Sequence, residues 1–113
     1  MHTVLEHIGS YAVLRIDSGL EYLSDVQALE RELQALVEDG ETNIAVDFSP
    51  VFQFQTKSVA FLLYIAKHLQ ASRGKLCFFG INEEFGYYLD LLDLHPLVEI
   101  FATEADFRAR HGL

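Results

Sequence analysis

The chain has 113 residues, a length typical of one domain. Half of the residues are hydrophobic, with nine phenylalanines and five tyrosines, so a core can form without disulfides or bound metals. The formal net charge of −9, from 17 acidic and 8 basic residues, argues against a nucleic-acid-binding protein and against adhesion to an anionic membrane. An acidic surface favours solubility, and it can also select a partner whose surface is basic.

Residues that commonly carry out chemistry do not stand in a recognisable pattern. The single cysteine, Cys77, excludes an internal disulfide and a multi-cysteine metal site, and its apolar neighbours indicate a small buried residue. The five histidines have no metal-ligand spacing, and there is no glycine-rich phosphate loop. Asp90 and Asp93 are more typical of a solvated helix face than of an acid–base pair. We therefore expect no enzyme, no cofactor and no metal site.

The sequence carries no sign of secretion or of membrane insertion. The first residues lack the basic start and apolar run of a signal peptide. No apolar stretch approaches the roughly 18 residues that cross a bilayer. Repeats and linkers are also lacking, so the sequence predicts a cytoplasmic protein with a single domain over residues 1–113.

Hydrophobic periodicity divides the first part of the chain into two strands and a helix. Residues 3–8 and 11–16 predict a hairpin that turns at Gly9. The segment Ser24–Gln27 has the spacing of a capping box, and Gly40 is expected to end the helix. The apolar face of this helix consists of Val26, Leu29, Leu33 and Leu36.

Strands and helices alternate in the rest of the chain. Residues 43–48 predict a buried strand, and a well-buried helix is expected from about Lys57 to Ser72. The remaining elements are a strand over 75–79, a helix capped by Asn82, a short strand over 97–101 and a helix that begins at Thr103. The order ββαβαβαβα predicts an α/β fold, with a mixed, mostly parallel sheet of four to five strands and about four helices packed on it. The first strand is expected to run antiparallel at an edge.

Residues 46–63, which read VDFSPVFQFQTKSVAFLL, resemble without a gap the pattern LDLSGVTFIDSSGLGVLL of the STAS domain, the fold of the anti-sigma-factor antagonists. The resemblance continues in RGKL at 73–76, FGI at 79–81, LDL at 92–94 and FATEA at 101–105. Each piece is weak alone, and their order and spacing over nearly the whole chain carry the resemblance.

This resemblance implies a role in signal transduction and transcription regulation through protein binding. In the family, a kinase-type anti-sigma factor phosphorylates the Ser or Thr that follows a conserved Asp, and a phosphatase removes the phosphate. The unphosphorylated antagonist binds the anti-sigma factor and frees the sigma factor. Carried over by position, the phosphorylated residue is Thr56. A homodimer is left open.

The chain departs from the family pattern around this position. Gln55 replaces the Asp, Lys57 replaces the second hydroxyl residue, and Ser58 replaces the Gly. In the earlier G-x-L-D segment, Tyr22 stands at the acid. The loss of the Asp removes a group that could orient the hydroxyl. Lys57 adds a charge that could stabilise a phosphate or repel a basic partner.

Thr56 also has an ordinary structural interpretation as the N-cap of the second helix, worth about 1 kcal/mol. The two roles are compatible, because unpaired N–H groups and the helix dipole favour negative charge at a helix start. A phosphate there would change the local charge by about −2. Ser58 is a weaker alternative acceptor.

The predicted partner-binding surface surrounds this hydroxyl. Phe52 and Phe54 alternate with glutamines in a loop, so one or both can form an exposed docking patch. The full predicted set is Phe52, Phe54, Gln55, Thr56, Lys57 and Ser58. The altered QTKS motif also favours an alternative function, a non-switching module such as the cytoplasmic accessory subunit of an ABC-type lipid transporter. A small-ligand sensor is a third hypothesis.

Overall fold

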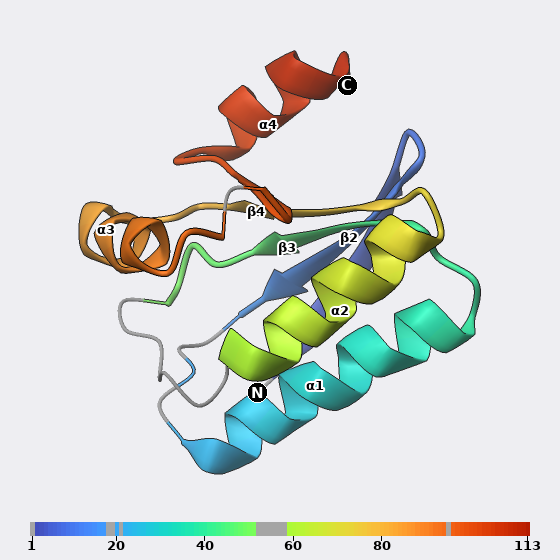
Figure 1. Ribbon diagram of the computed structural model, residues 1–113, viewed down its shortest axis with the longest axis horizontal. Coiled ribbons are helices and arrows are strands. Elements are labelled where there is room, and N and C mark those ends of the chain that lie inside the picture. The colour runs from blue at the N-terminus through green and yellow to red at the C-terminus, as the bar shows by residue number, and fades with distance from the viewer. Residues whose placement is uncertain (1, 18–19, 21, 52–58, 95) are drawn as a thin grey trace.

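The computed structural model in Figure 1 describes residues 2–17, 20, 22–51, 59–94 and 96–113. The elements alternate in the predicted order ββαβαβαβα. They are β1 (Thr3–Ile8), β2 (Tyr11–Ile16), α1 (Leu23–Glu38), β3 (Asn43–Asp47), α2 (Val59–Ala71), β4 (Lys75–Phe79), α3 (Glu83–Leu91), β5 (Val98–Ile100) and α4 (Glu104–His111).

The strands form a five-stranded sheet in the order β1-β2-β3-β4-β5. β1 lies at the edge and pairs antiparallel with β2, as predicted. The pairs β2–β3, β3–β4 and β4–β5 are all parallel. The predicted α/β class with a mixed, mostly parallel sheet is therefore confirmed.

Helices cover both faces of the sheet. In Figure 1, α1 and α2 lie side by side against one face, and α4 lies against the other. Within β3, Ile44, Ala45 and Val46 are all fully buried, which explains why a strand covered on both faces reads as a continuous apolar run. Among the described residues, no helix has both the length and the apolar character that a membrane span requires.

Successive residues of the strands point to opposite faces and so enter two separate cores. The larger core, on the side of α1 and α2, also receives Phe85 and Leu89 from α3. The smaller core lies between the sheet and α4. It consists of Tyr11, Val13, Ala45, Cys77, Phe79 and Phe107, with Ile8 and Phe101 packed against them. The prediction that Cys77 is a small buried residue is confirmed, because it is 0% exposed.

The start of α1 differs from the prediction. Its N-cap is Tyr22, and the first helical residue is Leu23, so Ser24 lies inside the first turn. The carboxylate of Asp25 accepts the backbone N–H of Tyr22 at 3.4 Å. An acid three residues after the N-cap forms one half of a capping box. The spacing Ser24–Gln27 therefore placed the helix start about two residues too late.

The predicted caps of the last two helices are confirmed. At α3, the side-chain oxygen of Asn82 accepts the backbone N–H of Phe85 at 2.7 Å. At α4, the hydroxyl of Thr103 accepts the backbone N–H of Asp106 at 3.1 Å. Each bond satisfies a backbone donor that has no partner within its own helix.

The turn between α2 and β4 requires a glycine at position 74. The N–H of Gly74 donates to Leu69 at 2.7 Å, and the N–H of Lys75 donates to the Thr42 carbonyl at 2.9 Å. A Cβ atom on Gly74 would overlap the carbonyl oxygen of Thr42. This contact joins the end of α2 to the chain that leads into β3.

We predict that Gly74→Ala lowers the free energy of unfolding by about 1–3 kcal/mol, because the new methyl group forces the two backbone segments apart. Gly86→Ala is the matched control. Gly86 is helical, and its added Cβ would make only an ordinary 3.6 Å contact with Ile81, so this change should leave stability unchanged or raise it. Urea unfolding measures both. Equal stability of the two variants would contradict the close approach at Gly74.

Candidate partner-binding site

The segment predicted to bind a partner lies outside the described residues. This applies to Phe52, Phe54, Gln55, Thr56, Lys57 and Ser58, and to the predicted helix start near Thr56. The phosphorylation of Thr56 and the partner contacts of these residues therefore stay predictions. The structure does describe the chain on both sides of the segment.

The chain that leads into the segment is firmly packed. Phe48 follows β3, and its N–H donates to the Phe79 carbonyl at 2.9 Å. The Phe48 ring is fully buried and meets the rings of Phe78 and Phe85 edge to face, with centroids 5.0 and 5.4 Å apart. Val51 is also buried, and its N–H donates to Phe48 at 2.8 Å. Residues 43–48 were predicted to form a buried strand; β3 itself ends at Asp47, and Phe48 just beyond it is buried as expected.

Asn82 ties this chain to the start of α3. Its side-chain N–H group donates to the Val51 carbonyl at 3.1 Å, while its oxygen caps the helix. One side chain therefore fixes the end of the described loop beside the N-terminus of α3. The segment 52–58 begins at this point, at the carboxyl edge of β3 and β4.

On the other side of the segment, α2 carries exposed aromatic side chains. Phe61 is half-buried, whereas Tyr64 is 55% exposed. The rings of Phe61 and Tyr64 lie 6.4 Å apart, and those of Tyr64 and His68 lie 6.3 Å apart. We call these three residues the aromatic ridge. Exposed aromatic side chains in contact with one another are common at protein–protein interfaces.

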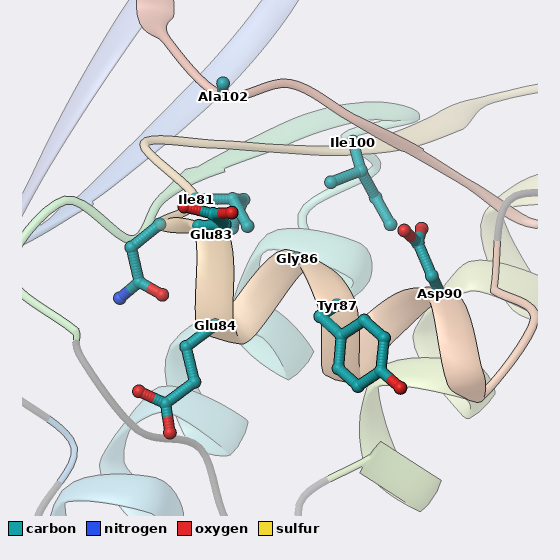
Figure 2. Close-up of a pocket in the computed structure, with 9 residues that line it drawn as sticks. Ile81, Glu83, Glu84, Gly86, Tyr87, Asp90, Ile100 and Ala102 are labelled. Carbon is teal, nitrogen blue, oxygen red and sulfur yellow. The ribbon is translucent and has the colours of Figure 1, made fainter.

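An open hollow of about 810 Å³ lies beside α3 (Figure 2). Its apolar lining includes Ile81 and Ile100, and its polar lining includes Glu83, Glu84 and Asp90. Tyr87 stands at its side and is 67% exposed. We call this the acidic hollow. Sequence reasoning missed it, because Ile100 and Ala102 come from a distant part of the chain and reach α3 only through the pairing of β4 with β5.

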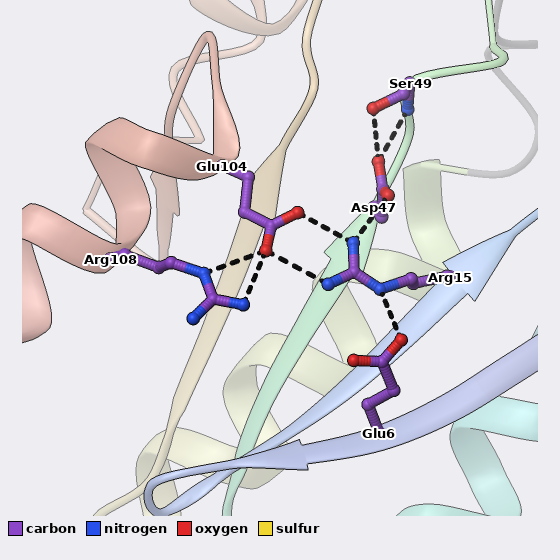
Figure 3. Close-up of polar contacts among 6 residues, drawn as sticks. All are labelled: Glu6, Arg15, Asp47, Ser49, Glu104 and Arg108. Atoms are coloured by element: carbon purple, nitrogen blue, oxygen red, sulfur yellow. Dashed lines mark hydrogen bonds and ion pairs between the residues drawn. The ribbon is translucent and has the colours of Figure 1, made fainter. Parts of the chain in front are cut away.

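A cluster of charges centred on Arg15 fixes the end of β3 from the other face of the sheet (Figure 3). The Arg15 guanidinium donates to both oxygens of Glu104, at 2.8 and 3.0 Å, and to Asp47 at 3.1 Å and Glu6 at 3.0 Å. Arg108 donates to the same Glu104 carboxylate at 2.9 Å. A two-pronged arginine–carboxylate pair sets geometry as well as charge. Here it connects α4 to three neighbouring strands.

Asp47 also holds the loop that follows β3. One of its oxygens accepts from Arg15, and the other accepts from the backbone N–H and the hydroxyl of Ser49. Gly80, with φ at +72°, packs directly against Ser49, where a Cβ atom would overlap the hydroxyl. The loop is therefore held between Asp47 and the end of β4.

The Arg15 cluster shifts the pKa values of Glu104 and Arg15. Hydrogen bonds from Arg15, supported by Arg108, lower the pKa of Glu104 from 4.5 to about 2, although partial burial opposes the shift. The same bond to Glu104 raises the pKa of Arg15. Both groups therefore stay charged at neutral pH, and the cluster remains intact there.

The chain matches the STAS domain model over residues 2–107 and belongs to that family. Known structures with the same fold include a putative anti-sigma factor antagonist from Thermotoga maritima, at 16% identity and a TM-score of 0.82, over 96% of this chain and 92% of that one.

Two structures of the Bacillus protein SpoIIAA also match. The phosphorylated form has 19% identity and a TM-score of 0.72, over 96% of this chain and 98% of that one. The unphosphorylated form, described as an anti-sigma factor antagonist, has 18% identity and a TM-score of 0.71, over 96% of each chain. No curated protein matches the sequence.

We predict that Glu104→Gln weakens the pH dependence of folding. Because the folded pKa of Glu104 lies below its ordinary value, its stabilisation is present above pH 4.5 and is lost as the pH falls towards about 2. The variant should lose about 1 kcal/mol at neutral pH, a modest value because the pair is partly exposed to solvent.

Denaturant unfolding as a function of pH measures this effect. Glu32→Gln, on the exposed side of α1, is the matched control and should keep the wild-type profile. If Glu104→Gln and wild type lose stability in parallel between pH 4.5 and 2, the proposed role of the Arg15 cluster is wrong.

Proposed function

We propose that this protein is a switch of the anti-sigma-factor antagonist type. In its unphosphorylated form it binds a kinase-like anti-sigma factor or a related regulator in the cytoplasm, and phosphorylation of Thr56 ends the complex. A phosphatase restores the binding form. The observation that carries the proposal is the position of Thr56 within a STAS-family match over residues 2–107. The existence of phosphorylated and unphosphorylated structures of SpoIIAA supports control by phosphate.

The surroundings of segment 52–58 support partner binding rather than catalysis. The acidic hollow adjoins the point where the segment begins, because Asn82 lines the hollow and also bonds to Val51. The aromatic ridge lies on α2, which follows the segment. A kinase that bears basic residues around its nucleotide cleft would complement the acidic hollow, while its apolar surface would cover the ridge.

In this proposal, the charge that phosphoryl transfer places on Thr56 is what ends the complex. The kinase must bring the γ-phosphate of ATP to the hydroxyl of Thr56. The Thr56 oxygen then forms a bond to phosphorus, ADP leaves, and the hydroxyl proton passes to a base on the kinase. The phosphorylated Thr56 carries a charge of about −2 and faces the phosphates of the ADP that is still bound to the kinase. Like charges at such short range repel, so product release follows from the transfer itself.

A non-switching STAS module is the second candidate, and the replacement of the family's Asp by Gln55 favours it. Without that carboxylate, the threonine hydroxyl loses a group that could orient it for transfer. In this case the same surface would bind a constant partner, such as the ATPase of an ABC-type lipid transporter, and Thr56 would serve only as a helix cap.

We predict that a kinase-type anti-sigma factor from the same organism transfers phosphate from ATP to Thr56. Mass spectrometry should find the phosphate on residue 56 in the wild type, and Thr56→Ala should abolish the modification. Ser58→Ala is the matched control and should still be phosphorylated. Thr56→Glu, which mimics part of the added charge, should weaken binding of the kinase at least about tenfold, a loss of about 1.4 kcal/mol.

Two results would separate the candidates. Binding that is equally strong for Thr56→Ala, Thr56→Glu and wild type, with no modification of residue 56, contradicts the switch. Recovery of a transporter ATPase by all three forms would then favour the non-switching module.

A further inference from the structure

Three potential metal ligands from distant parts of the chain meet beneath α4. Cys77 and Glu99 are direct partners in the parallel pairing of β4 with β5, so both side chains emerge on the same face of the sheet. His111 reaches them from the last turn of α4. One ligand atom of each residue lies within 4.8 Å of the others. Two strands and a helix therefore bring a thiol, a carboxylate and an imidazole to one point.

The His111 ring is held in place by aromatic neighbours. Its centroid lies 5.0 Å from that of Tyr11, 5.4 Å from Phe107 and 6.1 Å from Phe101. The Nδ1 atom faces the Tyr11 hydroxyl at 3.4 Å, and the Nε2 atom faces Cys77 Sγ at 3.9 Å and Glu99 Oε1 at 3.4 Å. A histidine that binds a metal through one nitrogen usually has a hydrogen-bonding partner at the other.

Glu99 supplies a second, independent observation. Its Oε1 atom is buried and accepts no hydrogen bond from any residue that the structure describes. Lys75 Nζ forms an ion pair with this oxygen at 3.1 Å, and His111 Nε2 lies 3.4 Å away, so a metal ion would take the place of the lysine ammonium. Buried oxygens in native proteins almost always accept a hydrogen bond or bind an ion.

We propose that Cys77, Glu99 and His111 form a binding site for a divalent transition-metal ion, with Zn²⁺ as the best fit. One thiolate, one imidazole and one carboxylate are all zinc ligands, and the two negative charges balance the ion. Three protein ligands leave the fourth tetrahedral position to a water molecule. Neither the STAS fold nor the proposed switch requires this site.

Two of the three ligand pairs lie close to the separations expected around a tetrahedral zinc ion. Zinc bonds of about 2.3 Å to sulfur and about 2.0–2.1 Å to nitrogen and oxygen place a nitrogen and an oxygen ligand about 3.4 Å apart, and a sulfur and a nitrogen about 3.6 Å apart. The observed His111–Glu99 separation is 3.4 Å, and the Cys77–His111 separation is 3.9 Å. The third pair, Cys77 and Glu99, lies within 4.8 Å, whereas a tetrahedral zinc ion needs about 3.6 Å, so a side chain has to move by up to about 1 Å to close the site.

Two local changes must accompany metal binding. The Cys77 thiol is fully buried, and the ion has to displace its proton. Lys75, which is 58% exposed, must also move from Glu99 into solvent, and Arg110 near the other carboxylate oxygen is 72% exposed. Binding should therefore strengthen as the pH rises, and it should tie α4 to β4 and β5.

Titration of the full chain with Co²⁺ tests the proposal, because a bound thiolate gives cobalt a charge-transfer absorption band in the near ultraviolet. At slightly alkaline pH the wild type should bind one equivalent and show this band. Cys77→Ser should lack the band, and His111→Gln should bind Zn²⁺ at least about tenfold more weakly by calorimetry. His2→Gln, which removes an exposed histidine far along the chain from the three ligands, is the matched control and should bind like the wild type.

The proposal fails if the folded wild type gives no thiolate–cobalt band, or if His111→Gln binds Zn²⁺ as tightly as His2→Gln. Circular dichroism checks the fold of each variant. If Cys77→Ser does not fold, Glu99→Gln is used instead. The Glu99 side chain is 28% exposed, so its replacement disturbs the core less. Zn²⁺ should also raise the melting temperature of the wild type more than that of Glu99→Gln. None of these readouts depends on Thr56.

Discussion

The parallel pairing of β3 with β2 on one side and β4 on the other is the constraint on which the rest of the structure depends. Parallel strands end at a common edge, so the residues after β3 and β4 are brought together there. The bond from Phe48 to Phe79 and the bond from Asn82 to Val51 both form at this edge. The start of segment 52–58, the acidic hollow and the cap of α3 are therefore consequences of one strand register.

The two faces of the sheet carry different features. The face covered by α1 and α2 holds the larger core, and α2 carries the aromatic ridge on its outer side. On the opposite face, α4 packs through Phe107 and is fixed at its first turn by the pair between Glu104 and Arg15. Its last turn brings His111 over Cys77. Metal binding at the proposed site would thus act on α4. The three ligands do not belong to the described residues that flank segment 52–58.

The sequence predicted much of the fold because strands and helices impose different hydrophobic periods. The helix caps at Asn82 and Thr103 were also visible, since they depend on neighbouring residues alone. The start of α1 was predicted about two residues too late. The prediction took Gln27 as the second residue of the capping box, whereas Asp25 takes that role in the structure. The meeting of Cys77, Glu99 and His111 was not predictable, since it requires a particular register and a particular helix position.

The measurement that most directly tests the central claim is amide hydrogen–deuterium exchange of this protein with and without the proposed kinase-like partner. If the carboxyl edge of β3 and β4 is the functional surface, binding should slow exchange in residues 48–62 and in α3, and leave β1 and α4 unchanged. Slower exchange confined to β1 or α4, with no change at that edge, would contradict the account.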